Sequence, residues 1–249
     1  MKRLRLLFML CAALTGIASF AANVAVNHLT TENTTNPQGL GTTVPRFSWQ
    51  LSSEKRQVVQ TAYHIMVAST PRLLERGEAD LWNSGEVKSD AQLWIDYRGR
   101  ALQSGDEAYW RVRVTTNRGK TEWSAVQRFT IGLLGENRWS GLEELQPGER
   151  KGMYTRLAAR YLRKEFKLKG RVKRAMAYVA GLGVHEFFVN GIRMGGHHVL
   201  QPVSSDYRKT VYYNTYDVTE PLNASHTACL AIMLGNGRLF PMRQEKPYK

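Results

Sequence analysis

Cysteine is nearly absent from the 249-residue chain, which contains only Cys11 and Cys229. Removal of an N-terminal leader would leave Cys229 alone, and this excludes an intrachain disulfide. An exported domain without disulfides must be stabilised by its hydrophobic core. The roughly 230 remaining residues suffice for one large or two ordinary domains, each with such a core.

Long apolar runs are equally scarce. The longest spans residues 6–14, which is shorter than the roughly 20 residues that a membrane-spanning helix requires. Three basic residues precede this run and small residues ending at Ala22 follow it, a pattern typical of a secretory signal. We predict a signal peptide over residues 1–21, cleaved near Ala21, and an exported protein, periplasmic or secreted, with no membrane span.

Acidic residues are outnumbered, with 21 Asp and Glu against 35 Lys and Arg. The net charge is +14, and loss of the three leader cations lowers it to +11. Such an excess can indicate nucleic acid or an anionic surface as partner. Export argues against nucleic acid. The densest basic stretch, residues 150–174, contains charges at every second position from 163 to 169, so we interpret it as a solvated strand face.

Helical periodicity is rare, whereas two-residue alternation recurs. In residues 109–115, Trp110, Val112 and Val114 alternate with arginines, which predicts a strand with one buried face. Similar strands are expected at 47–49, 63–67 and 126–131, with turns at 83–85 and 117–119 and a short helix at 71–79. This spacing predicts a first antiparallel β-sandwich over residues 23–134.

A stretch without periodicity, residues 135–159, is expected to link this sandwich to a second strand-rich domain at 160–249. There, residues 163–168 are predicted to pair with 172–180, and further strands are expected at 211–218 and 228–234. Residues 185–189 lead into Asn190-Gly191, a sequence that favours a two-residue hairpin turn. Thr219 is expected to cap one helical turn that contains Glu220 and Pro221.

The order of motifs resembles the N-terminal part of glycoside hydrolase family 78, the bacterial α-L-rhamnosidases. The first domain resembles the family's fibronectin-like domain, and the second resembles the α-L-rhamnosidase N-terminal domain. The resemblance rests on Pro45-Arg46-Phe47-Ser48-Trp49, Leu81-Trp82-Asn83-Ser84-Gly85, Tyr109-Trp110-Arg111-Val112, Gly181-Leu182-Gly183-Val184-His185-Glu186, Val189-Asn190-Gly191, Leu200-Gln201-Pro202, Ser205-Asp206-Tyr207 and Thr215-Tyr216-Asp217-Val218.

This resemblance implies an all-β fold of two antiparallel sandwiches in tandem, a fibronectin type III-like domain and then a jelly roll. A jelly roll has about eight strands, so we expect the second domain to be truncated. The resemblance also implies that a separate C-terminal catalytic domain, missing from this chain, hydrolyses terminal α-L-rhamnose with inversion. Where many members have a tryptophan before the aspartate-tyrosine pair, this chain has Val203 and Ser204.

Catalytic and metal-binding residues are not recognisable in the chain. Inverting glycosidases need two carboxylates about 6.5–9.5 Å apart, and the adjacent Glu143 and Glu144 lie in the expected linker, where solvated surface is the better interpretation. His197 and His198 have no third ligand at metal-binding spacing. We predict no catalytic residue, no metal and no cofactor in this chain.

Carbohydrate contacts are expected at Asn190, Asp206 and Tyr207, where polar groups lie beside a ring. Asn190 also suits a plain turn role. Trp49 and Trp110 are expected in the core, and Trp123 at the sandwich edge. The favoured hypothesis is the accessory portion of an exported α-L-rhamnosidase acting on a rhamnose-containing glycan. The alternatives are a non-catalytic carbohydrate-binding protein and a structural β protein.

Overall fold

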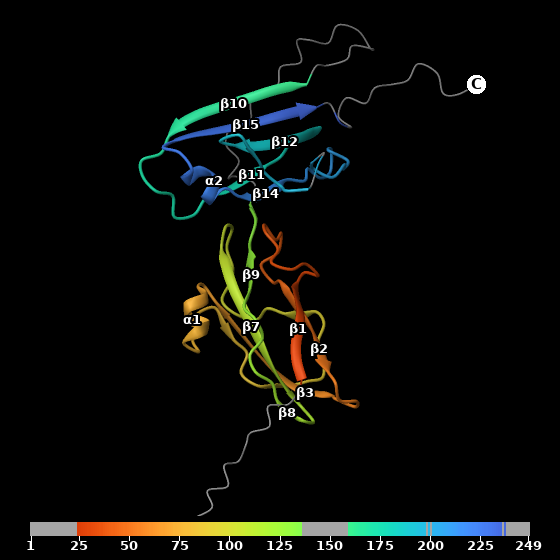
Figure 1. Cartoon of the computed structure of the whole chain (residues 1–249). Coiled ribbons are helices and arrows are strands. Elements are labelled where there is room, and N and C mark those ends of the chain that lie inside the picture. Colours follow the sequence, from red (N-terminus) through yellow and green to blue (C-terminus); the bar gives the residue numbers. More distant parts are fainter. Residues whose placement is uncertain (1–23, 136–158, 198, 200, 236, 238–249) are drawn as a thin grey trace, which may run out of the picture.

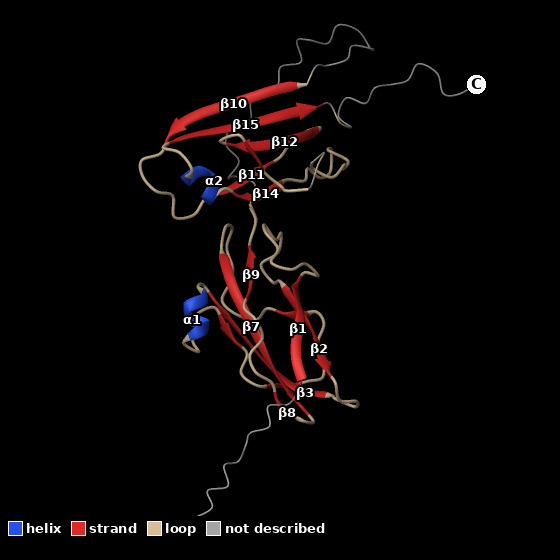
Figure 2. Cartoon of the chain, in the orientation of Figure 1, coloured by secondary structure: helices blue, strands red, loops and turns tan. Residues whose placement is uncertain are grey.

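The computed structural model describes residues 24–135, 159–197, 199, 201–235 and 237. Over these residues the chain forms fifteen strands and two helices of five residues each. The prediction of an all-β protein with antiparallel sheets is therefore confirmed. Figures 1 and 2 show the elements as two bodies in tandem. The predicted signal peptide, residues 136–158 of the predicted linker, and Glu143 and Glu144 lie outside the described residues.

The first domain is a sandwich of two antiparallel sheets. One sheet has the order β1-β2-β6, and the other has β3 and β7 at its centre with β4, β5, β8 and β9 paired to them. One core cluster takes side chains from both sheets. The strands are β1 Val24–Thr31, β2 Arg46–Ser53, β3 Gln60–Ala68, β4 Trp82–Asn83, β5 Val87–Lys88, β6 Ile95–Asp96, β7 Glu107–Thr116, β8 Gly119–Lys120 and β9 Gln127–Thr130.

The alternation of apolar and polar residues in β7 produces one buried face, as predicted. Burial changes at every residue of β7, and both predicted core tryptophans are buried, Trp49 at 1% and Trp110 at 0% exposure. Each indole N–H has a partner: Trp110 donates to Thr31 Oγ1 at 3.0 Å and Trp49 to Gln60 Oε1 at 3.1 Å. Burial of a large apolar side chain contributes about 1.5–3 kcal/mol, and these hydrogen bonds avoid the cost of an unpaired donor.

A small helix covers the outer face of the larger sheet. Helix α1, Pro71–Glu75, has proline in its first turn, where a missing N–H costs nothing. Its Leu74 is fully buried in a satellite cluster against β3. Trp123 packs on the same cluster, and its ring also contacts the guanidinium carbons of Arg111 and Arg113 at 4.4 and 4.6 Å.

The second domain contains a four-stranded sheet, ordered β10-β15-β12-β13, and a two-stranded sheet of β11 and β14. Side chains from both sheets and from helix α2 form one core cluster that includes Phe187, Val189 and Tyr216. The bounds are β10 Arg160–Lys167, β11 Met176–Val179, β12 Val184–Val189, β13 Ile192–Arg193, β14 Asn214–Asp217, α2 Thr219–Asn223 and β15 Thr227–Gly235.

The predicted pairing of 163–168 with 172–180 is wrong. Strand β10 pairs along its whole length with β15, and β11 pairs with β14. Alternation indicates which residues form strands, but partner choice depends on non-local packing. The expected cap is also corrected: Val218 occupies the N-cap position of α2, and Thr219 is the first helical residue. The Thr219 hydroxyl instead accepts a hydrogen bond from the Ala175 N–H at 2.9 Å.

Strand β10 is the most exposed long strand of the second domain. Seven of its eight residues are exposed, among them Tyr161 at 78% and Leu162 and Phe166 at 37% each. The exposed charges at 163, 165 and 167 match the predicted solvated face. The apolar side chains of β10 are therefore accessible in the described part of the chain.

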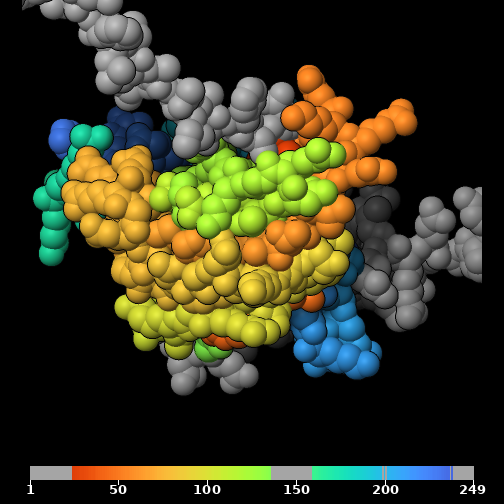
Figure 3. Space-filling view, turned by 90° about the horizontal axis from the view of Figure 1, so that it is seen from below, coloured from red at the N-terminus to blue at the C-terminus, as the bar shows by residue number. Residues whose placement is uncertain are grey.

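The two domains are stacked end to end. Seen from below in Figure 3, the first domain fills most of the view, and teal and blue parts of the second project past its margin. Strand β9 leads upward from the first domain toward the second in Figure 1. The end of β9 therefore lies at the junction between the domains.

Candidate functional site

Asn190, the first of the predicted sugar contacts, occupies the tight turn between β12 and β13. Its φ is 49° and that of Gly191 is 81°, so the predicted hairpin turn is confirmed. The side chain also links three elements, because its Oδ1 accepts from the Cys229 N–H at 2.7 Å and its Nδ2 donates to the Pro221 carbonyl at 2.9 Å. Asn190 thus joins the hairpin to β15 and α2.

Asp206 and Tyr207 lie in the loop between β13 and β14. The exposed Asp206 carboxylate accepts from Arg208 Nε at 3.1 Å and Nη2 at 3.2 Å. Its carbonyl accepts from the N–H groups of Lys209 and Thr210, which tightens the loop, and Tyr207 is partly buried. The side chain of Asn190 is hydrogen-bonded to β15 and α2, whereas the hydrogen bonds described for Asp206 stay within its own loop. Sugar binding at Asn190, Asp206 and Tyr207 stays a prediction.

A polar group is buried inside the second domain. His185 on β12 is only 2% exposed, and neither ring nitrogen has a hydrogen-bond partner among the described residues. Its backbone N–H donates to the Gln201 carbonyl at 2.6 Å, and the Gln201 side chain accepts from Asn214 Nδ2 at 2.7 Å. Burial lowers the pKa of His185 below its ordinary value, because the charged imidazolium would lose its hydration.

Charged side chains from both domains meet at the junction. Arg128 on β9 pairs with Glu107 on β7, and its Nη2 reaches Asp217 Oδ2 on β14 at 3.1 Å. Arg174 of the second domain approaches Glu107 from the other side, with Nε 3.4 Å from Oε2. These four side chains are 20–33% exposed. They form an alternating chain of charges across the junction.

Hydrogen bonding fixes the protonation state of Asp217 in this network. Burial by itself raises its pKa, but hydrogen bonds from Thr219 and Arg128 outweigh burial and hold the pKa below its ordinary value. Burial likewise disfavours the Arg128 cation, yet Asp217 and Glu107 raise its pKa overall. Both groups are therefore charged at neutral pH.

Tyr213 makes the junction close-packed. Its hydroxyl oxygen accepts from the Leu133 N–H at 2.9 Å, and its ring lies edge-on to Tyr178 at 5.9 Å between centroids. Arg174 Nη1 adds a hydrogen bond to the Gly105 carbonyl at 2.9 Å. The sequence contains no local signal for this junction, because Arg128 and Asp217 are 89 positions apart.

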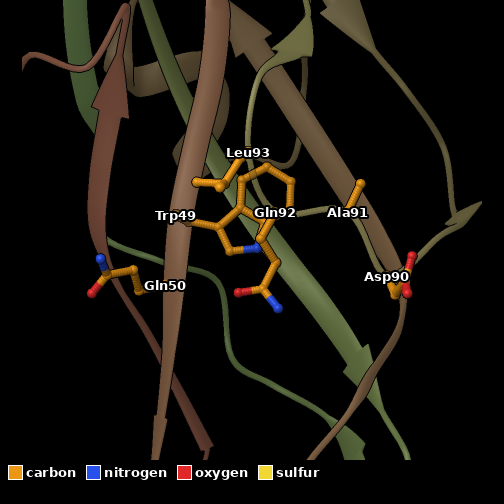
Figure 4. Close-up of a pocket in the computed structure, with 6 residues that line it drawn as sticks. All are labelled: Trp49, Gln50, Asp90, Ala91, Gln92 and Leu93. Carbon is orange, nitrogen blue, oxygen red and sulfur yellow. The ribbon is translucent and has the colours of Figure 1, made fainter.

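An open depression lies on the first domain beside β2. It measures about 510 Å³ and is lined by Trp49, Gln50 and the segment 90–93. Figure 4 shows Trp49 at its middle, with Gln50 on one side and Asp90 on the other. The next residue along the chain, Trp94, is 43% exposed. Sequence analysis did not single out Trp94, because it directly precedes β6 and its φ of +57° interrupts strand alternation.

Over the residues that the structure describes, no three His, Cys, Asp or Glu side chains are placed to hold a metal ion. His197 is exposed, and His198 lies outside the described residues. None of the helices described here has the length and apolar character to cross a membrane.

Two known domain families match the chain in consecutive order. Residues 26–135 match the Rha78A-like, N-terminal immunoglobulin domain. Residues 170–248 match the alpha-L-rhamnosidase N-terminal domain. The two matches correspond to the two bodies of the structure.

Curated relatives match most of the chain. An α-L-rhamnosidase of Formosa agariphila is 37% identical over 221 residues, which cover 81% of this chain and 23% of that protein. An α-L-rhamnosidase of Alteromonas sp. (strain LOR) is 33% identical over 223 residues, covering 86% and 24%. The chain thus spans about a quarter of the length of these relatives.

Solved structures of α-L-rhamnosidases are also similar to the chain. The chain superimposes on the α-L-rhamnosidase from Dictyoglomus thermophilum with a TM-score of 0.72 and 31% identity, over 86% of this chain and 25% of that one. The α-L-rhamnosidase from Aspergillus terreus gives a TM-score of 0.69 and 25% identity, over 86% and 24%.

Proposed function

Since the chain consists of a Rha78A-like N-terminal immunoglobulin domain and an α-L-rhamnosidase N-terminal domain, and is homologous to the N-terminal quarter of α-L-rhamnosidases, we propose that it is the accessory portion of such an enzyme. The whole enzyme would hydrolyse terminal α-L-rhamnose from glycosides or polysaccharides with inversion. We propose that it acts outside the cytoplasm, in the periplasm or secreted, after cleavage of a signal peptide near Ala21.

The observation that carries this proposal is the colinear match of both domains. Two unrelated sandwiches joined by chance would not reproduce the order of both matches and a superposition that covers 86% of the chain. A likeness of one sandwich alone would support only the architecture, since sandwiches serve many functions. The junction residues Arg128 and Asp217 add a physical reason for the two domains to act as a unit.

In this proposal the chain supports catalysis without performing it. Inverting hydrolysis requires an acid and a base carboxylate across the glycosidic bond. At the junction, Glu107 and Asp217 are paired with Arg128 and Arg174. The pKa of Asp217 is held below its ordinary value by hydrogen bonds from Thr219 and Arg128, whereas a general acid needs a raised pKa. The catalytic carboxylates are therefore proposed for the remaining part of the enzyme.

The test compares this chain with the product of the complete reading frame around its gene. The chain alone should release no nitrophenol from 4-nitrophenyl α-L-rhamnoside above a buffer blank, whereas the complete product should hydrolyse it. A reading frame that stops at codon 249, or a complete product without rhamnosidase activity, would favour the non-catalytic carbohydrate-binding alternative. Turnover by the chain alone that disappears on mutation of an acid within residues 22–249 would also overturn the proposal.

A further inference from the structure

Trp94 is an exposed aromatic side chain held in place by its surroundings. Its neighbour Ile95 in β6 packs against the core, whereas Trp94 packs on Arg46, an exposed residue of β2. Its backbone N–H donates to the Ser48 hydroxyl at 3.1 Å. The φ of Trp94 is +57°, a conformation that is unusual for a bulky residue. The surrounding structure therefore maintains an exposed indole in an unfavourable backbone conformation.

One face of the indole is already occupied. The guanidinium carbon of Arg46 lies 4.1 Å from the centre of the Trp94 ring. Glu32 fixes that guanidinium, since its carboxylate accepts from Arg46 Nη2 at 2.7 Å and from Nε at 3.1 Å. Although Arg46 packs on the ring, 43% of the residue remains exposed, so part of Trp94 is accessible to a ligand.

Polar groups suited to hydroxyl ligands line the depression that begins at the neighbouring residue, Leu93. Leu93, 61% exposed, joins Trp94 to the depression shown in Figure 4. Gln50, Gln92 and Asp90 contribute amide and carboxylate groups to its lining. An exposed apolar surface bordered by a few polar side chains is the usual composition of a small-ligand site, and a sugar ring offers a C–H face with hydroxyls at its rim.

The charge of this surface favours a neutral ligand. The cation of Arg46 is neutralised by Glu32 and faces Asp96 across the β2-β6 pairing, and the depression adds the carboxylate of Asp90. A chain with a net charge of +14 thus presents no excess of positive charge around Trp94. An anionic polysaccharide would find better complementarity elsewhere on the surface.

We propose that Trp94, with Leu93, Gln50, Gln92 and Asp90, forms a binding site for a neutral, rhamnose-containing glycan on the first domain. The exposed part of the indole would pack against the C–H face of one sugar, whose C5 methyl group would contact Leu93. The depression would hold the next sugar. The identity of the sugar rests on the proposed function, whereas the position of the site rests on the geometry of Trp94.

Affinity electrophoresis of the full chain in gels containing a neutral α-L-rhamnan tests this site. The wild-type chain should be retarded, and Trp94→Ala should raise the apparent dissociation constant for the rhamnan at least tenfold. Trp94→Gly also removes the ring, but glycine adopts a positive φ without strain. Loss of retardation in this variant would therefore reflect the missing ring and not misfolding. Tyr161→Ala is the matched control, because it removes an exposed aromatic ring from the other domain and should leave retardation unchanged.

Other results would refute either the position of the site or the class of its ligand. Equal retardation of the wild type and both Trp94 variants would refute the site. Tighter binding to a cello-oligosaccharide or to a sulfated polysaccharide would refute the assigned ligand class. The proposed function is tested separately, because rhamnosidase activity of the complete product does not depend on whether this chain binds the rhamnan.

Discussion

Gly132 and Tyr213 approach so closely at the domain junction that no side chain fits between them. A Cβ added to Gly132 would lie 2.2 Å from the Tyr213 hydroxyl oxygen and 2.8 Å from the Gly39 carbonyl oxygen. The same hydroxyl accepts the hydrogen bond from the Leu133 N–H. Glycine at position 132 therefore permits the contact that brings the two sandwiches together.

Gly132→Ala should loosen the junction. Because the added methyl group collides with backbone as well as with Tyr213, we expect a cost of about 1–3 kcal/mol, as for other overpacked sites. Small-angle scattering should show a more extended or variable particle. Gly135→Ala is the matched control, since its added Cβ meets nothing within 4 Å. Identical scattering profiles for the two variants would contradict this prediction.

Acidification should weaken the ionic part of the junction. The pKa of Asp217 is lowered in the folded chain, so its contribution is complete above the unfolded value near 4 and is lost as the pH falls through the folded value. Asp217→Asn should lower the free energy of unfolding by about 1–3 kcal/mol at pH 7, because it leaves Arg128 partly buried with one fewer charged partner.

Urea unfolding from pH 3 to pH 7 measures this effect. The difference in stability between wild type and Asp217→Asn should shrink as the pH falls below about 4. A difference that stays constant over this range would show that the carboxylate charge of Asp217 contributes nothing to the junction.

His185 should make the second domain sensitive to mild acid. Because burial lowers its pKa, the neutral imidazole is favoured in the fold, and stability should fall as the pH drops below the unfolded value of about 6.5. His185→Leu keeps a similar volume and removes both unpartnered ring nitrogens, so its stability should change less between pH 7.5 and 5. Thermal melts at these pH values provide the measurement, and parallel loss in both proteins would assign the pH dependence to other groups.

The second domain should open before the first. Its edge strand β10 exposes Leu162, Phe166 and Tyr161, and an edge with few buried contacts has low local stability. Limited proteolysis should therefore leave a resistant core near residues 23–134, and amides in β10 should exchange faster than those in β7. Equal resistance and equally slow exchange in residues 160–235 would show that the second domain is independently stable.

Several features followed from the sequence because they depend on neighbouring residues alone. Alternation in residues 109–115 indicated β7 and its buried Trp110, since successive side chains of a strand point to opposite faces. Asn190-Gly191 indicated its hairpin, because few other pairs tolerate two positive φ angles. Pro71 marked the start of α1 in the same way. The colinear motifs also sufficed to recognise the two domains.

Other features depended on which segments meet in space. The sequence placed β10 and β11 side by side, but β10 pairs with β15, because strand partners are chosen by burial of a shared face and not by proximity along the chain. The junction of Arg128 with Asp217 and the close approach of Gly132 to Tyr213 join residues more than 80 positions apart. The exposed position of Trp94 beside Arg46 and Glu32 likewise became evident only in the folded chain. Local chemistry thus determined the strands and turns, and tertiary packing decided their partners and the surfaces they expose.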